Sequence, residues 1–143
     1  MTLWFYNDGG RAAAGYRGDA GDCVTRALAI AAEMPYQQAY DLVNVACAGE
    51  ALGAKYRGKS SARTGVHKPT RKALLASLGW KWTPTMGFGT GCRVHLKADE
   101  LPPGRLIVAV SKHLVAVIDG VIHDTYDPSR GGTRCVYGYY SRV

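Results

Sequence analysis

An Asp119-Gly120 pair separates two apolar runs, residues 113–118 and 121–126, and this pattern constrains the fold more than any other stretch of the chain. A two-residue turn of the primed type needs positive φ angles at its centre, and Asp-Gly is among the sequences that adopt them most readily. The two apolar runs are therefore expected to form neighbouring antiparallel strands of one β-hairpin.

The register of this hairpin decides which side chains share a face. A two-residue turn places Ala116 opposite His123, so that His113 and Asp124 lie on the other face as diagonal neighbours, within reach of each other. A slip of one residue would exchange the two faces. Asp127 falls on the opposite face if pairing continues, but the proline after it favours the end of the strand. Asp124 is thus the first carboxylate candidate for His113, and Asp127 the alternative.

Further short apolar runs follow residue 80, separated by Gly, Pro and Asp as strands are. They predict strands at 80–83, 92–96, 105–110 and 134–140. The segment 3–7 is a short apolar start, and the Gly- and Ala-rich stretch 8–21 is expected to be a loop.

The first half of the chain instead shows apolar residues at helical spacing. Asp22 is a suitable N-cap for the first helix, and the third pattern runs from Pro69 to Gly79, as helix termini favour. These patterns predict helices at 23–33, 36–48 and 69–79. The expected fold class is α+β, with N-terminal helices packed on a C-terminal antiparallel β-sheet. A length of 143 residues fits a single domain, 1–143.

Cys23 opens the first predicted helix, and the first helical turn stabilises negative charge on sulfur. A histidine that takes the thiol proton and a carboxylate that orients the imidazole complete the arrangement used in acyl transfer. Cys23, His113 and Asp124 supply these three residue types. The alternative is a core thiol that happens to begin a helix, because cysteines are common in protein cores. In that case Asp124 would be a surface carboxylate paired with an arginine such as Arg134.

The segments GDC at 21–23 and KHLVAVIDGVIHD at 112–124 resemble the papain-like cysteine peptidase superfamily. The likeness is to its small bacterial and phage members, such as bacteriocin leader peptidases and cell-wall amidases, and covers the architecture over 22–140. It implies a papain-like fold with Cys23 as nucleophile, His113 as general base and then acid, and Asp124 as orienting carboxylate. It implies no cofactor.

The resemblance also implies an oxyanion hole to which the backbone N–H of Cys23 contributes. Many members of the superfamily add a glutamine about six residues before the cysteine; here Arg17 occupies that position and Asp19 lies closer. Arg17, Asp19 and Asn7 are therefore the candidates for an oxyanion-hole or substrate contact.

A net charge of +7 and a pI near 9.4 favour an acidic partner. A protein or peptide substrate with acidic groups is the first expectation, and nucleic acid is less favoured. The basic loop 53–66 and the segment 83–93 are expected to border the cleft. No signal-peptide pattern opens the chain and no segment approaches the length of a membrane span, so a cytoplasmic location is expected, in a bacterial host or phage-associated. The sequence leaves the oligomeric state open.

In a cytoplasmic protein the four cysteines are expected to be reduced thiols. Cys92 and His95 have the spacing of a metal-binding pair, with His113, His123 and Cys135 further along. On a strand, however, residues three apart face opposite sides, so no metal site is predicted. The glycine-rich stretch 85–91 lacks the lysine and the following helix of a phosphate loop.

The function predicted first is a cysteine-dependent hydrolase that cleaves a peptide, isopeptide or related amide bond through a thioester at Cys23. The alternative is a non-catalytic papain-like binding module, a phage-type accessory or anti-defence protein that uses a basic surface to bind a host protein or nucleic acid. A binding module would tolerate Cys23→Ser, whereas the enzyme requires an accessible, acidic thiol.

Overall fold

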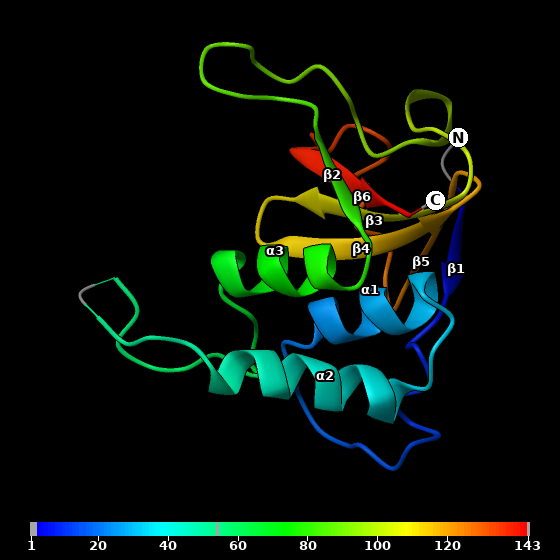
Figure 1. The fold of residues 1–143 in the computed structure, drawn as a ribbon. Coiled ribbons are helices and arrows are strands. Elements are labelled where there is room, and N and C mark those ends of the chain that lie inside the picture. The colour runs from blue at the N-terminus through cyan, green and yellow to red at the C-terminus, as the bar shows by residue number, and fades with distance from the viewer. Residues whose placement is uncertain (1–2, 54, 143) are drawn as a thin grey trace.

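The computed structural model of the protein describes residues 3–53 and 55–142. It is mixed α+β, with three α-helices, one short 3₁₀ helix and a six-stranded sheet (Figure 1). The elements are β1 (Trp4–Tyr6), α1 (Cys23–Ala31), α2 (Tyr36–Ala48), α3 (Lys68–Ser77), β2 (Lys81–Pro84), η1 (Ala98–Glu100), β3 (Arg105–Val110), β4 (His113–Ile118), β5 (Val121–Asp124) and β6 (Gly138–Ser141).

The predicted hairpin is confirmed together with its register. Asp119 and Gly120 have φ angles of 49° and 80°, as a primed two-residue turn requires. Ala116 pairs with His123, and Val117 pairs with Ile122. The side chains of β4 and β5 are therefore distributed between the two faces of the sheet as the sequence predicted.

The strand order is β1-β5-β4-β3-β6-β2, and the sheet is mixed rather than antiparallel throughout. The apolar start at 3–7, which was not expected to be a strand, contributes β1 at one edge and runs parallel to β5. Its three residues are all exposed, so they lack the alternation of buried and exposed positions by which a strand is recognised in a sequence. The prediction of a purely antiparallel sheet is wrong at this edge.

Helices cover one face of the sheet, with α1 directly against it and α2 outside α1 (Figure 1). The apolar stripe of α1 packs with alternate residues of β3 and β4, including Leu28, Ile107 and Leu114, in one buried cluster. The intervening strand residues form a second cluster on the opposite face, where Leu96 and Val136 of the connecting loops cover them. None of the helices among the described residues is both long and apolar enough to cross a membrane.

Two predicted strands are largely loops. Residues 92–96 contribute only an isolated bridge between His95 and Cys135, and of 134–140 only the end from Gly138 belongs to a strand. This bridge brings Cys92 next to Cys135, and the two form a disulfide. The expectation of four reduced cysteines is therefore wrong for this pair, because the 43-residue separation hides the contact. Cys23 and Cys47 are free thiols.

Candidate active site

Cys23 is the first residue of α1, at the end of the sheet where β4 begins. The approach to the helix is tight: a Cβ atom on Gly21 would lie 3.0 Å from the carbonyl oxygen of Thr64. Asp22 occupies the N-cap position, but its side chain makes no capping hydrogen bond. Its carboxylate instead accepts hydrogen bonds from Arg26 and, at 2.6 Å, from the hydroxyl of Tyr36. The predicted N-cap position of Asp22 is therefore confirmed, but its side chain does not form the capping hydrogen bond.

His113 and Asp124 meet at the opposite end of the hairpin from its turn. The His113 Nε2 and Asp124 Oδ2 atoms are 2.6 Å apart, and both side chains are buried. The hairpin register produces this contact, as predicted. Asp127 is exposed and its carboxylate accepts the backbone N–H of Ser129, so it does not take the place of Asp124.

The alternative partner for Asp124 does not reach it. Arg134 donates its guanidinium hydrogen bonds to Ser111 and to the carbonyl oxygen of Pro128. Asp124 is 3% exposed, which excludes a surface carboxylate.

The electrostatics of Cys23 and His113 are coupled. Burial alone would raise the pKa of the Cys23 thiol, but a hydrogen bond and the positive charge of His113 outweigh it and lower that pKa. Burial alone would lower the pKa of His113, but hydrogen bonds and charge interactions with Asp124 and Cys23 raise it to about 9. Both directions favour the thiolate–imidazolium pair over the neutral thiol and imidazole.

Arg26 completes this group and was missed in the sequence. Its guanidinium donates to Asp22 and, at 3.2 Å, to Asp124, so it bridges the residue before Cys23 and the carboxylate that holds His113. Its charge also lowers the pKa of Cys23. Asp22 and Arg26 are four residues apart on a predicted helix start, a spacing at which opposite charges meet, and this signal could have identified Arg26.

A cavity of about 430 Å³ opens beside these residues, with both Cys23 and His113 in its wall. The basic residues Lys68, Arg71 and Lys112 also line it. The only acidic side chain among the described residues of its wall is Asp22, which is already paired with Arg26. The cavity therefore presents the Cys23 thiol within a wall of mainly basic charge.

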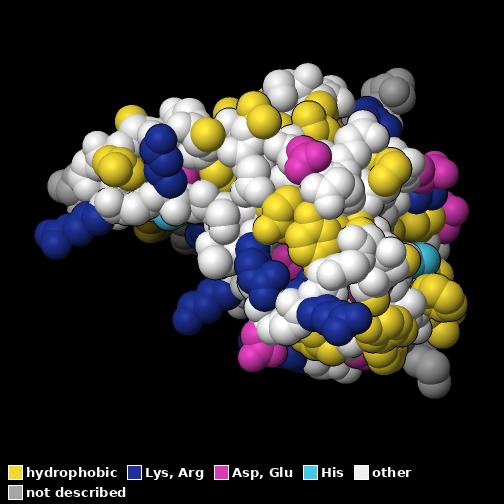
Figure 2. Space-filling model, turned by 90° about the horizontal axis from the view of Figure 1, so that it is seen from below, with side chains coloured by type: hydrophobic (Ala, Val, Ile, Leu, Met, Phe, Trp, Pro, Cys, Tyr) yellow, Lys and Arg dark blue, Asp and Glu magenta, His cyan; other side chains and the backbone are white. Residues whose placement is uncertain are grey.

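The expected neighbours of the cleft are only partly there. Of the basic loop 53–66, residues 64–66 line the cavity, while Lys and Arg side chains project from the part of the loop that extends away from the body (Figure 2). No residue of 83–93 lines it, so that prediction is wrong. The segment instead begins in the last two residues of β2, the strand at the opposite edge of the sheet from β1.

The three candidates for oxyanion-hole or substrate contact are not in the cavity wall. The Asn7 amide lies 3.3 Å from Nδ1 of His123, whose ring belongs to the other face of the hairpin. Arg17 is exposed, and its carbonyl oxygen accepts hydrogen bonds from Arg11 and Arg63. Asp19 lines a separate shallow depression next to Gly21. A second oxyanion donor besides the start of α1 is therefore not assigned to any of them.

The structure also corrects the argument against a metal-binding group. Residues 92–95 do not form a strand, so Cys92 and His95 are not turned to opposite faces. Ligand atoms of Cys92, His95 and Cys135 all lie within 4.8 Å of one another, whereas His113 and His123 belong to the hairpin and take no part.

Comparison with known proteins adds no relative: no family, no curated protein and no solved structure matches the chain.

Proposed function

We propose that the protein is a papain-like cysteine hydrolase that cleaves a peptide, isopeptide or related amide bond through a thioester at Cys23. The observation that carries the proposal is the sharing of one cavity by a thiol of lowered pKa and a histidine hydrogen-bonded to a buried carboxylate. These are the nucleophile, the proton carrier and the orienting group of thiol-dependent acyl transfer. A helix that begins with the cysteine and packs against the sheet that carries the histidine supports a papain-like fold.

The chemistry follows from these groups. The Cys23 thiolate attacks the carbonyl carbon, and the backbone N–H of Cys23 at the start of α1 stabilises the negative oxygen. The C–N bond breaks, and the departing amine takes the proton of the His113 imidazolium. Water then attacks the thioester, gives a proton to His113, and breaks the C–S bond so that the thiolate returns. Asp124 keeps the His113 ring oriented through both steps.

Alkylation of the native protein tests this proposal. At pH 6 an ordinary thiol is only about 0.3% ionised, so we expect Cys23 to react with iodoacetamide far faster than Cys47. We expect His113→Ala to slow alkylation of Cys23 at pH 6 by about tenfold to a hundredfold, because the pKa of the Cys23 thiol then returns toward that of a free thiol. The rates are measured between pH 5 and 9 and resolved by peptide mass spectrometry.

Cys47 is an internal control for alkylation, because burial raises the pKa of its thiol.

Turnover of an amide substrate, which needs the proton on His113, should fall as the pH rises past about 9. Equal rates for the two cysteines, unaffected by His113→Ala, would leave the basic binding module as the better explanation. So would a partner that binds the Cys23→Ser variant unchanged while no amide is cleaved.

The basic wall of the cavity supports a preference for anionic substrates. Lys68, Arg71 and Lys112 line it. Lysine and arginine side chains bind carboxylates through charge-assisted hydrogen bonds. An acidic peptide, or an amide next to a carboxylate, matches this surface better than a neutral chain does.

Two alkylating reagents, one anionic and one neutral, measure this preference without a known substrate. The rate of alkylation of Cys23 by iodoacetate, divided by the rate with iodoacetamide, should fall by about threefold to fivefold in the Lys68→Glu variant. The Lys112→Glu variant should show a similar fall, since each substitution reverses a charge in the cavity wall. Lys72→Glu, on the same helix but not in the wall, is the matched control. The difference should shrink in 1 M salt. An unchanged ratio in both wall variants would remove charge selection from the proposal.

A further inference from the structure

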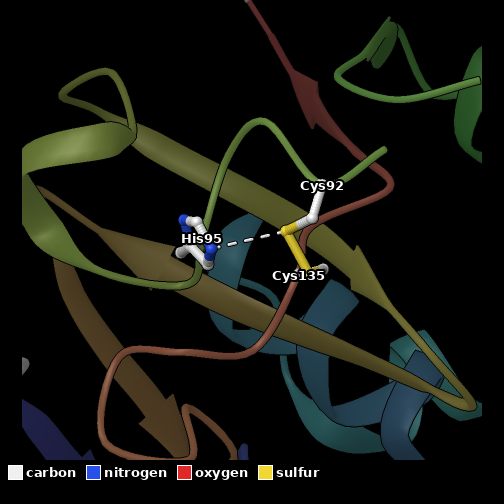
Figure 3. A group of neighbouring side chains, drawn as sticks. All are labelled: Cys92, His95 and Cys135. Carbon is white, nitrogen blue, oxygen red and sulfur yellow. Dashed lines mark hydrogen bonds between the residues drawn. A yellow bond between two sulfur atoms is a disulfide. The ribbon is translucent and has the colours of Figure 1, made fainter. Parts of the chain in front are cut away.

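Cys92, His95 and Cys135 form a second group of chemically active side chains, away from the cavity of Cys23 (Figure 3). The Sγ atom of Cys92 lies 3.4 Å from Nε2 of His95, and Cys135 approaches from the neighbouring loop. A tetrahedral zinc ion with a Zn–S bond of about 2.3 Å and a Zn–N bond of about 2.0 Å holds its sulfur and nitrogen ligands roughly 3.5 Å apart. The sulfur–nitrogen spacing of the group is already close to this value.

The ring of His95 is oriented for metal binding by a carboxylate. Glu100 Oε1 lies 3.1 Å from Nδ1 of His95, which leaves Nε2 facing the sulfur of Cys92 (Figure 3). The other oxygen of Glu100 is held 3.1 Å from the ammonium group of Lys97. A carboxylate on the remote nitrogen is the partner that metal-ligating histidines commonly have, because it fixes the tautomer and raises the basicity of the ligand.

The backbone keeps the two loops together without help from the disulfide. Leu96 N–H donates to the carbonyl oxygen of Arg134, and Val136 N–H donates to that of Val94, both at 2.8 Å. Leu96 and Val136 are themselves fully buried in the second core cluster, on the face of the sheet opposite α1. Cleavage of the disulfide would therefore leave the three ligand side chains side by side.

We propose that the dithiol form of this group binds one zinc ion through Cys92, His95 and Cys135, with water in the fourth position, and that the disulfide is the alternative, metal-free form. A thiol reductant supplies two electrons and two protons to break the S–S bond and is itself oxidised to a disulfide. Zinc then displaces the protons of the two thiols and the sulfurs separate to about 3.8 Å. The two forms exclude each other because both use the same sulfur atoms.

Cobalt(II) is the probe that tests the site, since two thiolate ligands give it an intense charge-transfer band in the near ultraviolet. The protein is used as Cys23→Ser, so that the thiol of the candidate active site does not contribute. After reduction under anaerobic conditions we expect one equivalent of cobalt to bind and zinc to displace it. The oxidised protein should show no band.

Variants assign the ligands. Cys92→Ser, Cys135→Ser and His95→Ala should each weaken cobalt binding at least tenfold, and Glu100→Gln by about tenfold to a hundredfold. Cys47→Ser, which removes the other free thiol, should leave binding unchanged. Circular dichroism checks that the reduced protein and each variant stay folded. The proposal is overturned if the reduced protein unfolds, shows no charge-transfer band, or binds cobalt equally well without Cys92 or without His95.

Discussion

Replacement of Arg26 by methionine is expected to lower the free energy of unfolding by about 3 to 5 kcal/mol, the usual result of removing one partner from a buried ion pair. The side chain of Arg26 is 11% exposed and its guanidinium contacts Asp22 and Asp124, whose side chains are 1% and 3% exposed. Methionine fills the volume of the arginine stem but leaves both carboxylates without this charge. Urea denaturation at neutral pH measures the loss.

Three further variants separate charge from packing. Arg57→Met makes the same substitution on an exposed loop and should change the unfolding free energy by less than about 0.5 kcal/mol. Arg26→Lys keeps the charge but lacks the planar fork that spans two carboxylates, so its loss should be intermediate. Asp22→Asn combined with Arg26→Met should recover part of the loss, because it removes the charge of a buried carboxylate whose remaining cation is Arg11, at 3.5 Å. Full stability of Arg26→Met would contradict a bridging role.

The same variants connect stability to the site. Arg26 touches Asp124, which in turn holds His113, so Arg26 is a positioning residue for the proposed chemistry. Arg26→Met should therefore reduce the selective alkylation of Cys23 at pH 6, and Arg26→Lys should restore part of it. A purely structural arginine would change the denaturation curve and leave the alkylation profile of the folded protein as it was.

Local patterns predicted the helices and the central hairpin well, because burial and turn chemistry determined them. Predicted helices at 23–33, 36–48 and 69–79 correspond to α1, α2 and α3 within two residues at each end. The hairpin register follows from Asp119-Gly120 alone, and it brings His113 to Asp124. The part of the site that lies within one supersecondary unit was therefore accessible from the sequence.

Contacts between distant loops were not accessible in the same way. The bridge between His95 and Cys135 depends on how two irregular segments cross the second face of the sheet, and neither segment has a periodic pattern. The strand rule that separates residues three apart was applied to Cys92 and His95, but these residues belong to a loop. The edge strand β1 was missed for a related reason. Its side chains are exposed, and it joins the sheet only through backbone pairing with β5.

Gly138 shows how such long-range packing constrains a single residue. It lies in β6 between Pro84 of β2 and Ala109 of β3, and it is buried. A Cβ atom there would be 2.7 Å from the carbonyl oxygen of Thr83 and closer still to the ring of Trp82. The ring also packs on Tyr140 with a centroid distance of 4.7 Å.

We therefore expect Gly138→Ala to lower the free energy of unfolding by about 2 to 3 kcal/mol, as overpacked core positions do. Alanine for glycine normally stabilises a chain by about 0.4 to 1 kcal/mol through the entropy of the unfolded state, so the sign of the effect depends on the clash. Gly58→Ala is the control, because its Cβ would meet nothing within 4 Å. Thermal and urea denaturation of both variants give the comparison.

A smaller side chain at position 82 shows where the strain of Gly138→Ala arises. Trp82→Leu relieves the contact with the ring but leaves the carbonyl oxygen of Thr83 in place, so the double variant should recover only part of the loss. No recovery would assign the whole cost to the backbone of β2, which must then move away from β6. A Gly138→Ala protein as stable as the original would contradict the pairing of Gly138 with Pro84, and with it the position of β2 at the edge of the sheet.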